Sequence, residues 1–293
     1  MDKKINHFEI GISTAVYLLT GIFFCLFLKE LYDTIDRIYI DGWNLLCLIW
    51  IVVIVNLIKA LRLYIILFGN QFSKTIYFMQ YFRTSFVNSL LPFKSGELYR
   101  GFCIGKIVGS YTEGYIAILF DRFVDTLALL SVIIFSSFFF GMKIKIIYIF
   151  LIIFLVLMML IYLFFIPFYQ YWNRFLIFYK SSEHTLSGLY FLEKCKEAFE
   201  HIRLLVKGRF LILYLISIFA WGLETATLFL GHDNDRGIEM STYLSAILTG
   251  KTNQSNLVFI AFSLGLFLGA GLFLKLGIKR KEANTNATSG GVR

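Results

Sequence analysis

The stretch from Ile144 to Phe168 reads IKIIYIFLIIFLVLMMLIYLFFIPF, and it decides the fold class of this chain. A helix needs about 20 apolar residues to cross a hydrocarbon core about 30 Å thick. This stretch is longer than that, and its one charged residue, Lys145, stands near its beginning. It therefore predicts a transmembrane helix.

Similar apolar runs recur along the rest of the chain. They are Phe8–Leu28, Trp43–Phe68, Thr112–Phe140, Phe210–Gly231 and Leu257–Leu276. Hydrophobic residues make up 58% of the chain and charged residues 16%, where soluble domains have about 25% charged residues. Long runs with only two prolines favour helices over a barrel, whose strands would show short alternating segments. The first run is too long for the apolar region of a signal peptide, so we expect a retained span.

These runs predict an all-α membrane protein, a polytopic helical bundle with six full spans. Most of the Lys and Arg in the loops lie on the side of the N-terminus, which predicts cytoplasmic termini in a cell (plasma or inner) membrane. Both ends of the segment 69–111 then lie in the cytoplasm, so we expect a re-entrant or broken-helix pair there. Residues 1–281 are expected to form a single transmembrane domain, and residues 282–293 a polar, disordered cytoplasmic tail.

The net charge of +9 does not indicate nucleic-acid binding, because the basic residues flank apolar spans. The four cysteines and four histidines form no spacing typical of a metal or redox site. We therefore expect no metal, no cofactor and no nucleic-acid partner. Membrane lipids are the expected partners, with a lipid-synthesis enzyme as a further candidate; no oligomeric state follows from the sequence.

The polar stretch from Gln80 to Lys106 does not resemble the other spans. Pro92 ends or kinks a helix, and Gly96 permits a turn or a close approach. Short segments broken by Pro and Gly are the best sequence indication of a transporter's binding site. The alternative is a cytoplasmic loop between ordinary spans. The polar residues of this stretch that we select as a lipid-headgroup or cavity site are Asn88, Ser89, Lys94, Glu97 and Arg100.

The predicted third span contains three charged residues, Asp121, Arg122 and Asp125. A charge at the bilayer centre costs about 2.5–3.5 kcal/mol on insertion scales, so these side chains must be paired or face a polar cavity. Glu97 with Arg100, and Arg122 with Asp125, are three residues apart and can pair on a helix. We favour a cavity over a structural ion pair near the interface.

Three further predictions concern Glu224, the two cations of the second span and residues 185–207. Glu224 lies within the fifth span and joins the candidate site, because an isolated intramembrane Glu is a functional hypothesis by default. Lys59 and Arg62 are interpreted as anchors that snorkel to the cytoplasmic headgroups. Residues 185–207 are expected to form an amphipathic helix at the membrane surface.

Two motifs together resemble those of a known family. Asn88-x-x-Leu-Pro-x-Lys-x-Gly-Glu-x-x-Arg100, followed by Arg122-x-x-Asp125, resembles the lysylphosphatidylglycerol synthase transmembrane region family. The resemblance implies flippase-like helical bundles with re-entrant segments around a lipid-accessible cavity. The chain departs from the family pattern at Lys94, where Arg is usual. A second Pro/Gly-rich motif is absent.

We therefore expect an integral membrane, flippase-like protein that binds a phospholipid or lipid-linked glycan and translocates or presents it. The alternatives are an intramembrane enzyme and an accessory scaffold of lipid or glycolipid modification. We assign no catalytic residue, since the sequence shows no activated nucleophile and no metal cluster. An enzyme is the less favoured class, and we do not expect lysyl transfer by this chain alone.

Overall fold

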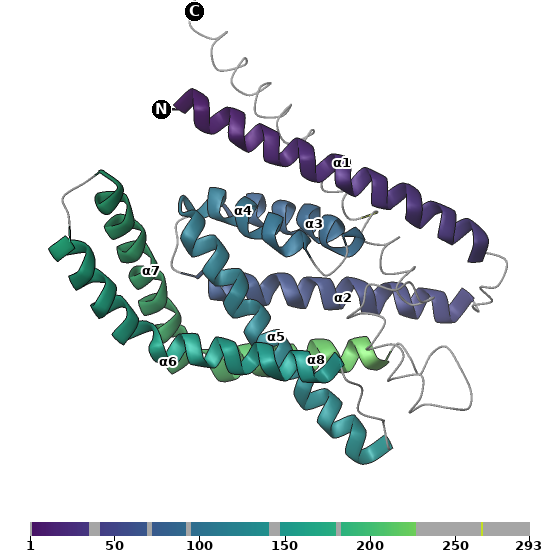
Figure 1. Cartoon of the computed structure of the whole chain (residues 1–293). Coiled ribbons are helices and arrows are strands. Elements are labelled where there is room, and N and C mark those ends of the chain that lie inside the picture. The colour runs from purple at the N-terminus through teal and green to yellow at the C-terminus, as the bar shows by residue number, and fades with distance from the viewer. Residues whose placement is uncertain are drawn as a thin grey trace, which may run out of the picture. The chain divides into compact units, whose positions relative to one another are not determined.

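The structure is a computed structural model that describes residues 2–34, 42–68, 72–91, 95–140, 147–179, 183–226 and 265. These residues fold into helices and contain no strand (Figure 1). The helices are α1 (Asp2–Thr34), α2 (Gly42–Ile66), α3 (Lys74–Leu90), α4 (Gly96–Val108), α5 (Tyr111–Phe140), α6 (Ile147–Tyr179), α7 (Glu183–Gly208) and α8 (Phe210–Ala226). The predicted all-helical class is therefore confirmed.

The prediction of six full spans is not confirmed by the described residues. Three described helical segments are long and apolar enough to cross a membrane, namely Glu9–Lys29, Ile49–Ile66 and Tyr148–Phe178. A fourth arises if α7 and α8, which meet at a bend of 77°, are one broken span. The predicted third span is the continuous helix α5. The predicted sixth span, apart from Gly265, and the tail 282–293 lie outside the described residues.

The described helices belong to two compact units. One unit contains α1, α3 and α4 as far as Arg100. Aromatic side chains join α1 to the other helices of this unit. The ring centres of Phe24 and Phe86 lie 6.2 Å apart, and Tyr17 packs edge-on against Tyr99 with ring centres 6.0 Å apart. The guanidinium of Arg83 lies 4.9 Å from the centre of the Tyr17 ring.

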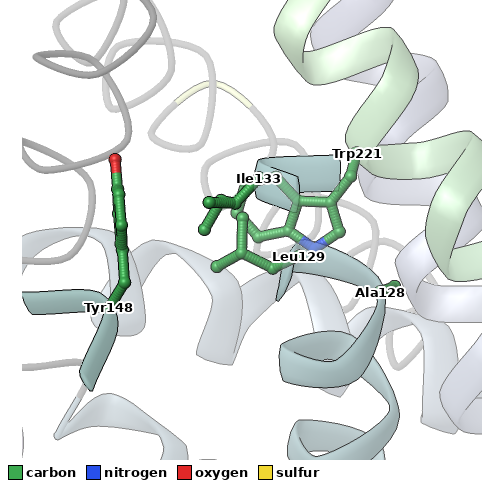
Figure 2. Packing of buried hydrophobic residues seen from close by; sticks show 5 residues of the cluster. All are labelled: Ala128, Leu129, Ile133, Tyr148 and Trp221. Atoms are coloured by element: carbon green, nitrogen blue, oxygen red, sulfur yellow. The ribbon is translucent and has the colours of Figure 1, made fainter. Parts of the chain in front are cut away.

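The other unit contains α2, α4 from Gly101 onward and α5 to α8. Its apolar core is formed by α5, α6 and α8 and contains Ala128, Leu129, Ile133, Tyr148 and Trp221 (Figure 2). The indole ring of Trp221 packs beside Leu129 and Ile133. This packing positions the polar side chains of α5 and α8.

Within the same unit, α6 and α7 form an antiparallel helical hairpin. The rings of Phe165 and Phe199 stack at 4.4 Å, and the hydroxyl of Tyr169 donates to Glu193 at 2.6 Å. The predicted helix over residues 185–207 is thus α7, and it packs along the C-terminal half of α6. Its position at the membrane surface stays a prediction.

Glycines bring α4 and α5 together. A Cβ added to Gly114 would lie 2.5 Å from the backbone nitrogen of Gly105, and one added to Gly101 would lie 2.6 Å from the Tyr115 ring. Between the two helices Gly109 has φ +84°, a conformation that favours glycine and ends α4. Gly101 and Gly105 form a G-x-x-x-G spacing, whose small residues let helices approach closely.

Candidate functional site

The most deeply buried charge described in the chain is Arg62 of α2, whose side chain is 0% exposed. Its guanidinium makes a two-pronged contact with Asp121 of α5: Nε donates to Oδ1 at 2.6 Å and Nη2 to Oδ2 at 2.8 Å. Paired N–H donors match the two oxygens of a carboxylate, which strengthens and orients such a contact. Helices α2 and α5 are therefore joined by a buried, directional ion pair.

The remaining Arg62 nitrogen extends this contact to a third helix. Nη1 donates to Oδ1 of Asp125 at 2.5 Å and to Oγ of Ser217 in α8 at 2.8 Å. Ser217 donates its own hydroxyl hydrogen to the carbonyl of Leu213 at 2.8 Å, so its oxygen is available as an acceptor. One arginine thus connects α2, α5 and α8.

Arg122 completes a group that we call the charge quartet: Arg62, Asp121, Arg122 and Asp125. Arg122 donates to Oδ2 of Asp121 at 2.6 Å and to Oδ2 of Asp125 at 3.1 Å. Two cations face two anions, so the quartet as a set is neutral. Burying a charge is tolerable only when it is paired and hydrogen-bonded, and this arrangement meets that condition.

The four members of the quartet differ in their access to the surroundings. The side chains of Asp121 and Asp125 are 2% and 5% exposed, close to the value for Arg62, whereas that of Arg122 is 19% exposed. Arg122 is therefore the member that an outside ligand can reach. The expected pairing of Arg122 with Asp125 is confirmed.

Lys59 and Arg62 do not act as the expected snorkelling anchors. Arg62 is fully buried in the quartet, and Nζ of Lys59 lies 2.6 Å from Oε2 of Glu224 in α8. Lys59 also lies 5.2 Å from the centre of the Trp221 ring. The anchor interpretation was wrong because both cations pair with buried carboxylates on neighbouring helices.

A second polar group lies in the other unit, where the start of α4 packs against α3. We call it the hairpin cluster, and it consists of Thr84, Asn88, Glu97 and Arg100. Arg100 donates to Glu97 at 3.0 Å and to Thr84 at 3.3 Å, and its guanidinium lies 4.6 Å from the Tyr81 ring centre. Nδ2 of Asn88 donates to Oε1 of Glu97 at 2.8 Å. The expected pairing of Glu97 with Arg100 is confirmed.

Gly96 makes the hairpin cluster possible. A Cβ at Gly96 would lie 2.4 Å from Cα of Asn88, so only glycine permits this approach of α4 to α3. The buried Oδ1 of Asn88 has no hydrogen-bond partner among the described residues. Ser89, also expected in the site, donates to the carbonyl of Ser85 at 2.9 Å. Pro92 and Lys94 lie outside the described residues.

The structure therefore brings the predicted site residues together in two sets. Asp121, Arg122 and Asp125 meet in the quartet, and Asn88, Glu97 and Arg100 meet in the hairpin cluster. Glu224 belongs to neither set and pairs with Lys59. Arg62 and Ser217 are partners in this site that were not predicted from the sequence. The available signal was Lys59 and Arg62 themselves, two cations one helical turn apart inside an apolar span.

Among the described residues, no group of three or more His, Cys, Asp or Glu could bind a metal ion. The buried charges of the described residues instead form ion pairs, some between helices and some within one helix. Apolar helices and buried, balanced ion pairs define a helical membrane protein whose buried charges are paired with one another.

A sequence model of the lysylphosphatidylglycerol synthase TM region matches residues 10–231. The chain belongs to this family, as its motifs predicted, and it is a membrane protein of lipid modification or transport. No curated protein and no solved structure matches the chain.

Proposed function

We propose that this chain is a flippase-like protein that binds a phospholipid or a lipid-linked glycan and translocates or presents it. The observation that carries the proposal is the charge quartet, which combines a buried arginine, two buried carboxylates and the partly exposed Arg122. Membership in the lysylphosphatidylglycerol synthase TM region family supports a lipid as the ligand class.

The carboxylates of the quartet lie well inside α5, and Arg62 lies four residues before the last residue of α2. Asp121 is ten residues from the first residue of α5, which corresponds to roughly 15 Å along the helix axis. Arg62 lies inside the candidate span Ile49–Ile66. Ionisable side chains at such positions mark substrate pathways in many membrane proteins. A lipid phosphate that reached Arg122 would gain charge-assisted hydrogen bonds from the guanidinium.

The hairpin cluster is a separate candidate site for a lipid headgroup. Glu97 and Arg100 are buried with opposite charges, and Oδ1 of Asn88 is a buried acceptor that no described residue hydrogen-bonds. A hydroxyl or ammonium group of a headgroup could donate to that oxygen. Lys94, the further cation expected to bind phosphate, stays a prediction.

The test is transbilayer movement of fluorescent phospholipids in vesicles containing the purified protein. The variants are Arg122→Ala in the quartet and Glu97→Ala in the hairpin cluster, and the matched control is Lys194→Ala, which removes an exposed cation of α7. We expect slower lipid movement in both site variants and wild-type rates in the control. Wild-type rates in both site variants would remove these residues from the site.

In the proposed orientation both termini lie on the cytoplasmic side of the cell membrane. The support is the excess of Lys and Arg in the loops on the N-terminal side. Labelling of cysteines introduced near either terminus, with a reagent that does not cross membranes, tests it in intact and opened cells. Labelling of intact cells would contradict the proposed orientation.

A further inference from the structure

The two carboxylates of the quartet that bind Arg122 are also bound by Arg62. Asp121 receives two N–H groups from Arg62, and its Oδ2 is shared with Arg122. Asp125 divides its oxygens: Oδ1 accepts from Arg62 and Oδ2 accepts from Arg122. If Arg122 turned away, both carboxylates would therefore keep a cationic partner.

Arg62 and Arg122 are not equivalent in this arrangement. Arg62 is fully buried and contacts two other helices, α5 through Asp121 and Asp125 and α8 through Ser217, so it has no route to a ligand. Arg122 contacts the carboxylates of its own helix, and part of its side chain is exposed. One arginine is fixed, and the other is the one that can change partners.

We propose that Arg62 is a positioning residue that allows Arg122 to exchange its carboxylate partners for the phosphate of an anionic lipid. This inference rests on the proposed function, since it requires a lipid that reaches Arg122. With Arg62 in place, the departure of Arg122 leaves one cation between two carboxylates, and the incoming phosphate is bound by Arg122 itself. Without Arg62, two uncompensated carboxylates would bind Arg122 and repel the phosphate.

The proposal predicts opposite effects from two single substitutions in the quartet. Arg62→Gln makes the quartet one charge more negative, so anionic lipid should bind about tenfold more weakly, the effect of one charge-assisted hydrogen bond. Asp125→Asn makes it one charge more positive and releases one contact of Arg122, so the same lipid should bind more tightly by a similar factor. A purely structural role would weaken binding in both variants.

The experiment measures binding of phosphatidylglycerol and of phosphatidylcholine to the purified full chain by native mass spectrometry. Both lipids carry a phosphate, but only the first has a net negative charge, so their affinity ratio reports the charge of the site. Arg62→Gln should lower this ratio, and Asp125→Asn should raise it. The double variant Arg62→Gln/Asp125→Asn restores neutrality and should return the ratio towards the wild-type value.

Two further measurements extend the experiment. One distinguishes an effect of charge from an effect on folding, and the other distinguishes a lipid ligand from free phosphate. Arg62→Lys keeps the positive charge but loses the two-pronged contact, so the ratio should stay near the wild-type value even if thermal stability falls. Glycerol 3-phosphate, which has the phosphate without acyl chains, should not displace the lipid at equal concentration. Displacement would show a site for free phosphate and contradict a lipid ligand.

The outcomes distinguish this inference from the proposed function. If Arg122→Gln leaves phosphatidylglycerol binding unchanged, the assignment of the lipid site fails. If Arg122→Gln weakens binding but Arg62→Gln and Asp125→Asn shift the affinity ratio in the same direction, the lipid site stands and the role of Arg62 is overturned. If Arg62→Gln does not fold, Asp125→Asn and the double variant decide the matter.

Discussion

The charge quartet and the hairpin cluster differ in how far apart their partners lie along the sequence. In the hairpin cluster Arg100 contacts Glu97, three residues away, and Thr84, sixteen residues away. In the quartet Arg62 contacts Asp121, 59 residues away, and outside the quartet it contacts Ser217, 155 residues away. The hairpin cluster is formed by one helical turn and a tight helix–helix approach, whereas Arg62 and its partners require three separate helices to pack correctly.

The two clusters also differ in how their charges are satisfied. The quartet places two cations among two carboxylates, and the Arg62 side chain uses all three of its nitrogens. In the described part of the chain, the hairpin cluster contains one ion pair, an aromatic face over Arg100 and Oδ1 of Asn88 without a hydrogen-bond donor. The quartet should therefore contribute more to stability, and the hairpin cluster should depend more on backbone geometry.

The largest expected effect comes from Arg62→Ala. This change leaves two buried carboxylates with one partly exposed cation, and losing one partner of a buried ion pair costs about 3–5 kcal/mol. We expect a much lower midpoint of thermal unfolding in detergent, measured by circular dichroism. Adding Asp125→Asn should recover part of the loss, and a double variant no more stable than Arg62→Ala would contradict the charge-balance explanation.

The second-largest effect on stability is expected from Gly96→Ala, beside the hairpin cluster. The new methyl group would overlap the backbone of Asn88, and such overpacking costs about 1–3 kcal/mol. The control is Gly21→Ala in α1, where a Cβ meets nothing within 4 Å. Thermal midpoints should fall for Gly96→Ala only. Equal midpoints for the two variants would mean that the close approach of α3 and α4 is not required.

A smaller effect is expected at the pair of Lys59 and Glu224. Lys59→Gln leaves the carboxylate of Glu224 buried without its cation, whereas Lys59→Gln/Glu224→Gln removes both charges. The double variant should therefore be more stable than the sum of the single effects predicts, by about 1 kcal/mol of coupling. Additive midpoint shifts would show that the two side chains do not interact in the folded protein.

The smallest effect is expected on the exposed face of α7. Nζ of Lys194 lies 2.6 Å from Oε2 of Glu197. Water screens such exposed ion pairs, and holding two long side chains together costs conformational entropy. Lys194→Ala should leave both the thermal midpoint and lipid movement at wild-type values. A clear loss of either would show that α7 contributes to the site.

Local sequence features predicted the parts of the molecule that depend on neighbouring residues. The pairs Glu97–Arg100 and Arg122–Asp125 followed from a spacing of three residues on a helix, and the break near Pro92 predicted two short helices. The same reasoning failed for Lys59 and Arg62. The charge of an arginine in an apolar span can be compensated by a lipid headgroup or by a buried carboxylate. Its sequence neighbours do not distinguish these two arrangements.

The sequence by itself determined that this chain is an all-helical membrane protein, because a bilayer requires long apolar helices whose backbone groups are satisfied internally. Its motifs also determined the family. Only the tertiary structure decided which charges meet, since the partners of Arg62 come from α5 and α8. Helix packing brings those side chains together, and the strong cost of leaving a buried charge unpaired makes that arrangement specific.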